Sequence, residues 1–251
     1  MQKRKIILSI VFTIILLFIC YFIFKIYNTL SDNKKIDEEI TKIKDEVIIK
    51  PETNDIVEEK KEEVEQPPII ENKLTMDFNK LKTINSDTVG WIKVNNTNID
   101  YPIVKGNDNT FYLNHSFYKE NNINGWIFMN SNNSSSFTDD NTILFGHNTN
   151  SKTMFSELRD IYKGNLGNQI DITIYLENDI LNYKVFSIYL ENPNNTGNIS
   201  EYTNDATVNN MKQKSKLNIN VEVTEDDQIL TLSTCNNVTE DRIIMHAKKL
   251  N

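Results

Sequence analysis

Cys235 is the residue of this 251-residue chain whose type and setting best suit covalent chemistry. The only other cysteine, Cys20, lies in an apolar run near the N-terminus that we expect to cross a membrane. A cysteine left without a disulfide partner outside the cell indicates either intermolecular pairing or a reactive thiol, although many unpaired cysteines are buried and inert. The cysteine count alone supports a reactive thiol and an inert one about equally.

The residues before Cys235 alternate as in a β-strand. Leu230 and Leu232 share one face, while Ser233 and Cys235 have the opposite parity and share the other face. The leucines should face the core, which places the thiol at the strand end on the more polar face. A reactive thiol at that point needs a cation or an imidazole nearby to stabilise the thiolate.

Arg242 is a cation within reach of Cys235, because it begins the next strand-like run, Arg242-Ile-Ile-Met-His-Ala. If residues 236–241 form a hairpin loop, the cysteine and the arginine end neighbouring strands. The guanidinium could donate two hydrogen bonds to a substrate carbonyl or a developing oxyanion. The alternative is a surface ion pair with Glu240 or Asp241, which would contribute little free energy.

Three histidines could supply the imidazole. His147 follows the strand-like run Thr142-Ile-Leu-Phe-Gly and precedes a polar break, a place where catalytic groups are common. His115 lies in an aromatic-rich stretch and suits a structural hydrogen-bonding role. His246 lies four residues beyond Arg242, roughly 13 Å further along an extended strand. The local pattern favours His147 only modestly.

The composition excludes several classes of protein. A net charge of −8 argues against a nucleic-acid binder, whose domain should carry a basic surface. Two cysteines exclude a disulfide-rich scaffold and a metal site of four thiolates. Three widely spaced histidines with no HExxH motif argue against a zinc enzyme, so we expect neither metal nor cofactor.

Residues 76–251 should form one mainly β domain that positions these side chains. Short β-rich runs recur between Asn-, Asp- and Gly-rich breaks. The expected strands span residues 91–94, 99–104, 125–129, 142–147, 169–176, 181–190, 229–234 and 242–248. Eight short strands with little helix between most of them favour a closed barrel or a sandwich. Helical patterns cover residues 76–84, 154–162 and, more weakly, 208–217, within a long segment, 192–220, that should carry a helix or form a functional wall.

Residues 6–24 have the properties of a transmembrane signal-anchor helix. The run has no charged residue and would span about 28 Å as a helix, close to a hydrocarbon core of roughly 30 Å. Lys3, Arg4 and Lys5 precede it, so residues 1–5 should remain in the cytoplasm. A cleaved signal peptide is the alternative, but the apolar run is long and no small-x-small site follows it.

Residues 25–75 should form a charged extracellular stalk. Most of this segment is rich in Glu, Asp and Lys and lacks aromatic residues, so it cannot bury enough apolar surface to offset the chain entropy. Ile36, Ile40, Ile43 and Val47 keep a helical spacing, which indicates a short solvated helix or coiled coil within the stalk.

The ordered motifs of residues 78–251 resemble those of the sortases. Thr231-Leu-Ser-Thr-Cys235 followed by Arg242-Ile-Ile-Met-His resembles their thiol and arginine strands, and Ile143-Leu-Phe-Gly-His147-Asn resembles their histidine segment. Three further blocks are similar to class B sortases in particular: Gly90-Trp-Ile-Lys-Val with Asn98-Ile-Asp-Tyr-Pro-Ile-Val, Phe111-Tyr-Leu-Asn-His, and Met154-Phe-Ser-Glu-Leu.

The resemblance implies an eight-stranded sortase-type barrel with a few peripheral helices. It also implies a cysteine transpeptidase that cleaves the C-terminal sorting signal of surface proteins, usually after Thr, and joins the acyl group to a cell-wall amine. By position, Cys235 would be the nucleophile, His147 the general acid and base, and Arg242 the stabiliser of the oxyanion. Ser233 and Thr234, before the cysteine, and Asn148, after the histidine, would bind substrate. The other two histidines would be structural.

The expected partners are surface proteins that carry a sorting signal and an amine acceptor, either a peptidoglycan precursor or a pilin, together with the membrane. The enzyme would belong to a Gram-positive cell surface. Two alternatives remain at this point: a thiol-dependent hydrolase of peptides or cell-wall stems, and a non-catalytic surface barrel.

Overall fold

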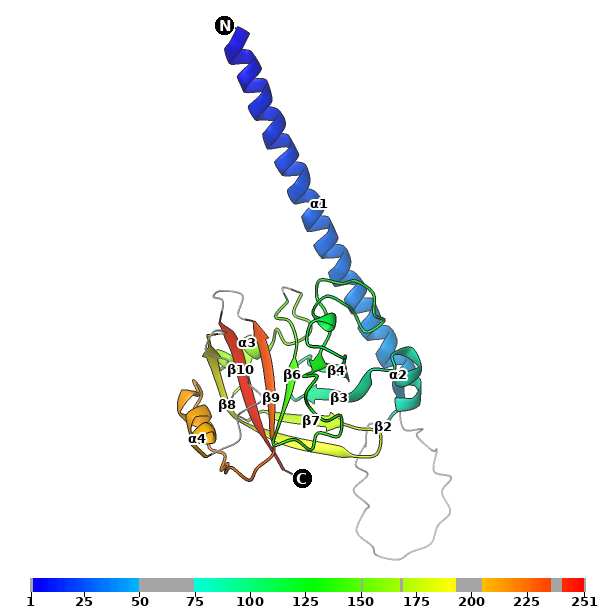
Figure 1. Ribbon diagram of the computed structural model, residues 1–251, viewed down its shortest axis with the longest axis vertical. Helices are drawn as coiled ribbons and strands as arrows, with labels where there is room; N and C mark the ends of the chain where they lie inside the picture. The colour runs from blue at the N-terminus through cyan, green and yellow to red at the C-terminus, as the bar shows by residue number, and fades with distance from the viewer. Residues whose placement is uncertain are drawn as a thin grey trace, which may run out of the picture.

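The computed structural model describes residues 2–49, 75–149, 151–167, 169–192, 205–235 and 241–250. In this part of the chain a closed barrel of eight strands lies at one end of a long N-terminal helix (Figure 1). The barrel that the sequence predicted is confirmed.

The barrel strands occur close to their expected positions. They are β3 (Thr88–Val94), β4 (Asp100–Val104), β5 (Phe128–Met129), β6 (Asn141–Phe145), β7 (Asp171–Tyr175), β8 (Ile180–Glu191), β9 (Ile229–Cys235) and β10 (Arg242–Lys249). Around the barrel their order is β10-β8-β7-β3-β4-β5-β6-β9, and β9 pairs with β10 to close it. The β4–β5 and β6–β9 pairs are parallel, and the other pairs are antiparallel.

One expected strand is much shorter than predicted. Residues 125–129 were expected to be extended, but β5 covers only Phe128 and Met129. Gly125 has φ +56°, and a Cβ atom there would lie 2.4 Å from the carbonyl oxygen of Tyr112. Trp126 then donates its backbone N–H to that same oxygen at 2.9 Å. The chain therefore bends tightly against residue 112 before the strand begins.

Helices cover parts of the barrel and precede it. They are α1 (Gln2–Val47), α2 (Phe78–Ile84), the 3-10 helix η1 (Phe111–Leu113), α3 (Leu158–Tyr162) and α4 (Asp205–Lys214). A short two-stranded sheet, β1 (Ile48–Ile49) with β2 (Thr75–Met76), joins the end of α1 to the start of α2. The three helices expected in the body all occur, and α4 lies in the long segment before β9.

The alternation predicted for β9 is confirmed, and β10 alternates in the same way. Leu230, Leu232 and Met245 belong to the main core cluster inside the barrel. Ile244, of opposite parity, belongs to a second, smaller cluster that includes Met211 of α4. Both faces of these strands are thus covered, one by the barrel interior and the other by α4 and the chain that follows it.

Helix α1 continues beyond the apolar run and packs against the barrel domain. Ile36, Ile43 and Val47 are fully buried and belong to the main core cluster. Lys44 forms an ion pair with Asp100 of β4, with Nζ 2.8 Å from Oδ2. The described part of the expected stalk is therefore not a solvated segment, because its helically spaced apolar residues pack against the barrel domain. Residues 50–74 of that stalk lie outside the described residues.

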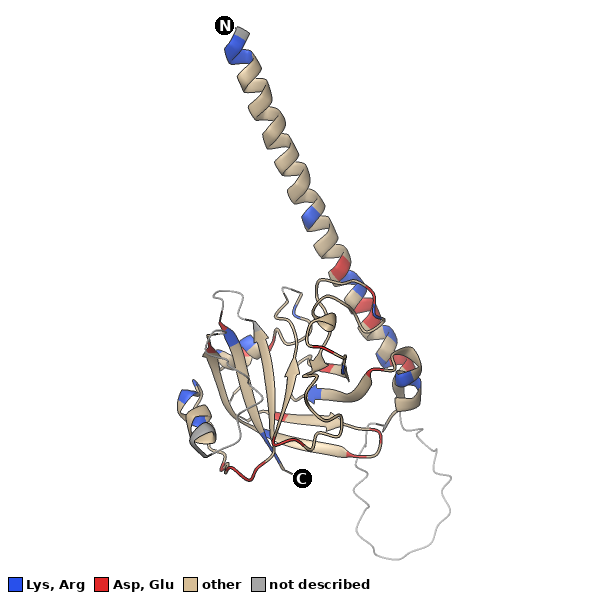
Figure 2. Ribbon diagram, in the orientation of Figure 1, with Lys and Arg blue, Asp and Glu red and all other residues tan. Residues whose placement is uncertain are grey.

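Among the described helices, α1 is the one long and apolar enough to cross a membrane. Figure 2 shows its N-terminal half without charged side chains between the basic start and Lys25. Beyond residue 31 the helix carries both acidic and basic residues, in the part that contacts the domain. The change in composition along α1 thus coincides with the change from an exposed helix to a docked one.

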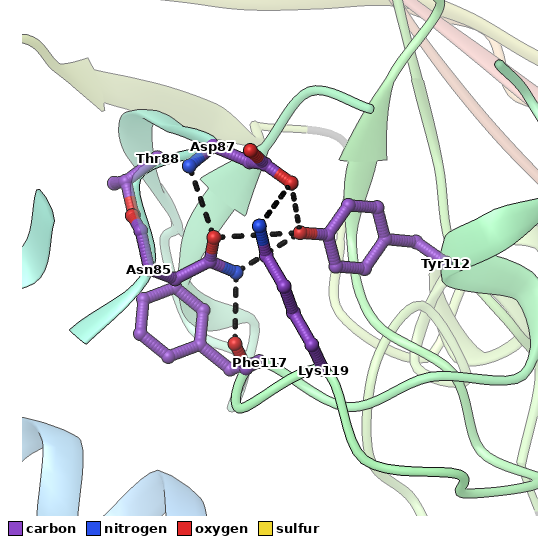
Figure 3. Close-up of polar contacts among 6 residues, drawn as sticks. All are labelled: Asn85, Asp87, Thr88, Tyr112, Phe117 and Lys119. Atoms are coloured by element: carbon purple, nitrogen blue, oxygen red, sulfur yellow. Dashed lines mark hydrogen bonds and ion pairs between the residues drawn. The ribbon is translucent and has the colours of Figure 1, made fainter. Parts of the chain in front are cut away.

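A polar network fixes the segment 111–125, part of the connection between β4 and β5, to the start of β3 (Figure 3). The hydroxyl of Tyr112 donates to Asp87 Oδ2 at 2.6 Å, and Asn85 Nδ2 donates to that hydroxyl at 3.0 Å. Asn85 Nδ2 also donates to the carbonyl oxygen of Phe117 at 2.8 Å, and Lys119 Nζ lies 2.9 Å from Asp87 Oδ2. The segment is therefore held by side-chain contacts although it contains little regular structure.

Candidate active site

Three neighbouring strands bring His147, Cys235 and Arg242 to one end of the barrel. Cys235 and Arg242 are Cα partners in the antiparallel β9–β10 pair. Strands β6 and β9 are parallel, and their last register pair joins Phe145 to Ser233. Because parallel chains advance together, His147 and Cys235 each lie two residues beyond that pair. This end of β9 and β10 is the end of the barrel toward which α1 runs to its N-terminus (Figure 1).

Gly146 follows the last residue of β6, at a point where neighbouring atoms leave no room for a side chain. Its backbone N–H donates to the carbonyl oxygen of Ser233 at 3.3 Å, which extends the contact with β9. A Cβ atom on this glycine would lie 2.8 Å from Cδ2 of Phe155. The N–H of Phe155 donates to the carbonyl oxygen of His147 at 3.0 Å. The backbone of His147 is thus fixed both by the thiol strand and by the chain before α3.

The His147 ring is oriented by a carbonyl group. Its Nε2 atom lies 2.7 Å from the carbonyl oxygen of Leu113, at the end of η1. A carbonyl oxygen only accepts, so Nε2 carries a proton and donates it. In the neutral ring the other nitrogen, Nδ1, is then the proton acceptor. Sequence reasoning missed this contact, because nothing in the local pattern links residue 113 to residue 147.

Arg242 begins β10, which lies between β9 and β8. On one side its Cα partner is Cys235, and on the other it is Glu191 of β8. The Glu191 carboxylate is almost fully buried and forms an ion pair with Lys214 of α4. The negative charge of Glu191 is therefore balanced by Lys214 of α4.

The other two histidines have structural surroundings. The His115 ring stacks on Phe111, with centroids 4.0 Å apart, and its Nδ1 lies 2.8 Å from the carbonyl oxygen of Phe111. His246 is fully buried between Thr231 Oγ1, 2.8 Å from Nδ1, and the Tyr189 hydroxyl, 3.0 Å from Nε2. Burial lowers the pKa of His246 to about 3, so the ring is neutral.

The predicted substrate-binding residues are buried and carry unpaired polar atoms. Within the described part of the chain, both amide atoms of Asn148 and the hydroxyl oxygens of Ser233 and Thr234 have no hydrogen-bond partner. Buried polar groups are normally satisfied, so such atoms are candidates to bind a peptide. Among the described residues, no group of three or more His, Cys, Asp and Glu side chains could hold a metal ion.

Comparison with known proteins identifies the family of this chain. A family model described as a sortase domain matches residues 92–250. The chain is 37% identical to sortase B of Staphylococcus aureus over 180 residues, which are 68% of this chain and 73% of that protein.

Solved structures give the same relationship. The crystal structure of Clostridium perfringens sortase B superposes with a TM-score of 0.63 at 34% identity, covering 70% of this chain and all of that one. A Staphylococcus aureus sortase B–substrate complex superposes with a TM-score of 0.62 at 34% identity, covering 69% of this chain and 84% of that one. The family match over most of the barrel and these similarities show that the chain belongs to the sortase family, as a class B sortase and hence a cysteine transpeptidase.

Proposed function

We propose that this sortase cleaves a C-terminal sorting signal of surface proteins after Thr, through a thioacyl intermediate on Cys235. The acyl group is then transferred to a cell-wall amine, supplied by a peptidoglycan precursor or a pilin. The observation that carries the proposal is the strand register, in which the cysteine pairs with Arg242 and lies beside the chain that continues into His147.

In the first half-reaction the Cys235 thiolate attacks the scissile carbonyl carbon, and the carbonyl oxygen takes on negative charge. Arg242 donates hydrogen bonds to this oxyanion, which is stabilised most when the donors are already in place. The C–N bond then breaks, and His147 as imidazolium gives its proton to the departing amine. The product is a thioester between the substrate Thr and Cys235.

In the second half-reaction an amine attacks the thioester carbonyl. Neutral His147 takes the proton that the amine loses, and the C–S bond breaks to return the Cys235 thiolate. A free cysteine has a pKa of roughly 8.5, so a thiol at neutral pH becomes reactive either by losing its proton to His147 or through a minor ionised population. Both routes leave the enzyme unchanged after one cycle.

The unpaired polar atoms of Ser233, Thr234 and Asn148 support a role for these residues in holding the peptide. A peptide backbone in the site offers N–H and C=O groups that could satisfy them. Since an unsatisfied buried polar atom costs roughly 1–3 kcal/mol, such pairing would add to substrate affinity.

The proposed topology places residues 1–5 in the cytoplasm, residues 6–24 in the membrane and the catalytic domain, 76–251, outside the cell. It is supported by the exposed apolar half of α1 and by the basic residues that precede it. Residues 25–75 then connect the membrane to the barrel, in part through the docked end of α1.

The test is whether Cys235 forms a thioacyl adduct with a sorting-signal peptide, which mass spectrometry detects as an added mass on the protein. The Cys235→Ala variant should form no adduct and cleave no peptide, while the matched Cys20→Ala variant should keep both activities because Cys20 is exposed on the apolar half of α1. Cleavage by the Cys235→Ala variant would contradict the assignment.

Two outcomes would indicate a different activity. If an added amine such as triglycine gives no amide product while the peptide is still cleaved, the protein is a hydrolase. If an electrophilic thiol reagent leaves Cys235 unmodified in the folded protein, the barrel is not catalytic through this residue.

A further inference from the structure

Exposed apolar side chains are rare on the described barrel domain. Outside α1, the exposed large hydrophobic residues are Leu113 at 42%, Ile123 at 57% and Leu250 at 58%. Leu250 lies beside the C-terminus, whereas Leu113 and Ile123 both belong to the segment 111–125. The bridge between His115 and Asn121 and the bond from Asn122 N–H to the carbonyl oxygen of Asn114 place Leu113 across from Ile123, so the two side chains form one small apolar patch, a candidate contact surface.

This segment lies against α1 at the first turn that contacts the domain. Asn122 Nδ2 donates to the carbonyl oxygen of Asp32 at 3.2 Å, and Asn124 Nδ2 donates to Asn33 Oδ1 at 3.0 Å. Ile123 is the residue between these two asparagines. In Figure 1 the segment, in green, lies beside α1 at the end of the barrel that faces the N-terminal half of the helix.

The length of α1 places this contact close to the bilayer. Asp32 lies about 12 Å beyond Phe24 along a helix that rises 1.5 Å per residue. The exposed apolar surface of α1 continues past Phe24 to Ile26, Tyr27 and Leu30. Because Asp32 is about 3 Å beyond Leu30 along the axis, it lies at the outer edge of the polar headgroup region when residues 6–24 fill the hydrocarbon core.

We propose that the segment 111–125 rests on the outer surface of the bilayer, with the side chains of Ile123 and Leu113 in the lipid interface. This proposal rests on the membrane anchoring by α1 proposed above. The occupant of the apolar patch is lipid, because Ile123 lies between two asparagines that bind α1 just beyond its exposed apolar half.

The contact would also orient the active site. The segment is held rigidly by the Tyr112–Asp87–Asn85 network (Figure 3), and its Leu113 carbonyl group binds the ring of His147. The ends of β9 and β10 that carry Cys235 and Arg242 lie on the same side of the barrel. With α1 and the segment both at the membrane, the thiol end of the barrel faces the lipid surface and meets substrates that are tethered there.

The experiment measures quenching of tryptophan fluorescence by brominated phosphatidylcholine in vesicles that hold the full chain. The native Trp91 and Trp126 are fully buried and provide the baseline. Three variants add one probe each: Ile123→Trp on the segment, Leu250→Trp as the matched control of equal exposure, and Phe18→Trp within the proposed span. We expect the added fluorescence to be mostly lost for Ile123→Trp and Phe18→Trp and retained for Leu250→Trp.

The outcomes separate the two proposals. Quenching of Phe18→Trp without quenching of Ile123→Trp would overturn the lipid contact and leave the anchor in place. A Phe18→Trp probe that is not quenched would overturn the anchor itself. Equal quenching of Ile123→Trp and Leu250→Trp would show that the barrel lies on the membrane with no preferred side, which contradicts the proposed orientation.

A second readout uses the Ile123→Asn variant with two substrates. We expect a several-fold lower rate on a sorting-signal protein embedded in the same vesicles and an unchanged rate on a soluble sorting-signal peptide. The Leu250→Asn variant should match the unmodified enzyme on both. Equal rates for the two variants on the embedded substrate would contradict the proposal.

Discussion

Gly146 has only hydrogen where another residue would carry a Cβ atom, and the ring of Phe155 occupies that space. In a Gly146→Ala variant the added methyl group, 2.8 Å from Phe155 Cδ2, should push the ring or the chain toward His147. Misplacement of a catalytic group by about 1 Å can cost up to a hundredfold in rate, so we expect kcat/KM to fall roughly ten- to a hundredfold.

The matched control is Gly106→Ala, where the new Cβ atom would make ordinary contacts of 3.4 Å and more. That variant should keep the activity of the unmodified enzyme. A double variant, Gly146→Ala with Phe155→Leu, should recover part of the loss because the smaller side chain leaves room. Full activity of Gly146→Ala alone would contradict the role of this close approach.

Arg242 is proposed to act through the geometry of its guanidinium, which a lysine cannot reproduce. An Arg242→Lys variant keeps the charge beside Cys235 but loses the two parallel N–H donors. We expect kcat to fall about a hundredfold or more, as when an oxyanion donor is removed, with a smaller change in KM. Steady-state kinetics with a sorting-signal peptide measure both constants. A change confined to KM would assign Arg242 to ground-state binding.

At the scale of elements, α1 serves two environments with one continuous helix. Its N-terminal half exposes apolar residues, and its C-terminal end buries Ile36, Ile43 and Val47 in the barrel domain. The docked end carries the charged residues that would keep the exposed face of the helix in water, such as Lys34 and Glu38. In the proposed topology, the helix would hold the barrel at a fixed distance from the membrane.

Shortening one docked side chain should destabilise the domain. We expect Ile43→Ala to lower the free energy of unfolding by roughly 2–5 kcal/mol, because the isoleucine is fully buried in the main core. Urea unfolding of a chain that begins at Ser31 measures this change. Lys34→Ala, on the exposed face of the same helix, should change the free energy by no more than about 0.5 kcal/mol. Equal stability of the two variants would show that α1 does not contribute to the fold.

At the scale of the whole molecule, the half-buried Glu39 and the buried His246 make stability depend on pH in opposite ways. Burial raises the pKa of Glu39, on the docked end of α1, from 4.5 to about 7, with Glu120 and the lysines 35 and 42 as its charged neighbours. Burial lowers the pKa of His246, on β10, from 6.5 to about 3, and Lys214 adds to this effect. Each group binds a different average number of protons in the folded and unfolded states, so the free energy of unfolding depends on pH.

The signs follow from the numbers of bound protons. Between pH 4.5 and about 7 the folded state keeps a proton on Glu39 that the unfolded state loses, so this contribution to stability decreases as the pH rises. Between pH 6.5 and about 3 the unfolded state binds a proton on His246 that the folded state does not, so this contribution decreases as the pH falls.

The Glu39→Gln variant tests the first contribution. Relative to the unmodified chain, it should become progressively more stable as the pH rises from 4.5 to 7, because glutamine has no proton to lose. Thermal unfolding at several pH values across this window measures the difference between the two chains. A difference that stays constant with pH would show that Glu39 is not buried against the barrel in solution.

The sequence by itself determined the faces of the strands and the motifs that identify the family. Alternation of side chains is a local property with a period of two, so Leu230 and Leu232 could be assigned to the core before any partner strand was known. The motifs around Cys235, His147 and Arg242 likewise identified the family. The helical spacing of Ile36 and Ile43 was also visible in the sequence. It predicted a helix there, but a solvated one, whereas the helix packs against the barrel domain.

Only the tertiary structure decided which segments meet. The parallel pairing of β6 with β9 joins residues far apart in the sequence, and barrel closure, not local pattern, selects that pair. The folded chain also brings the Leu113 carbonyl group to His147 and buries His246 between Thr231 and Tyr189. The docking of α1 depends on the barrel surface that receives it, and no property of the helix alone specifies that surface. Long-range contacts of this kind are set by the packing of the whole chain, which is why they appear only once the fold is complete.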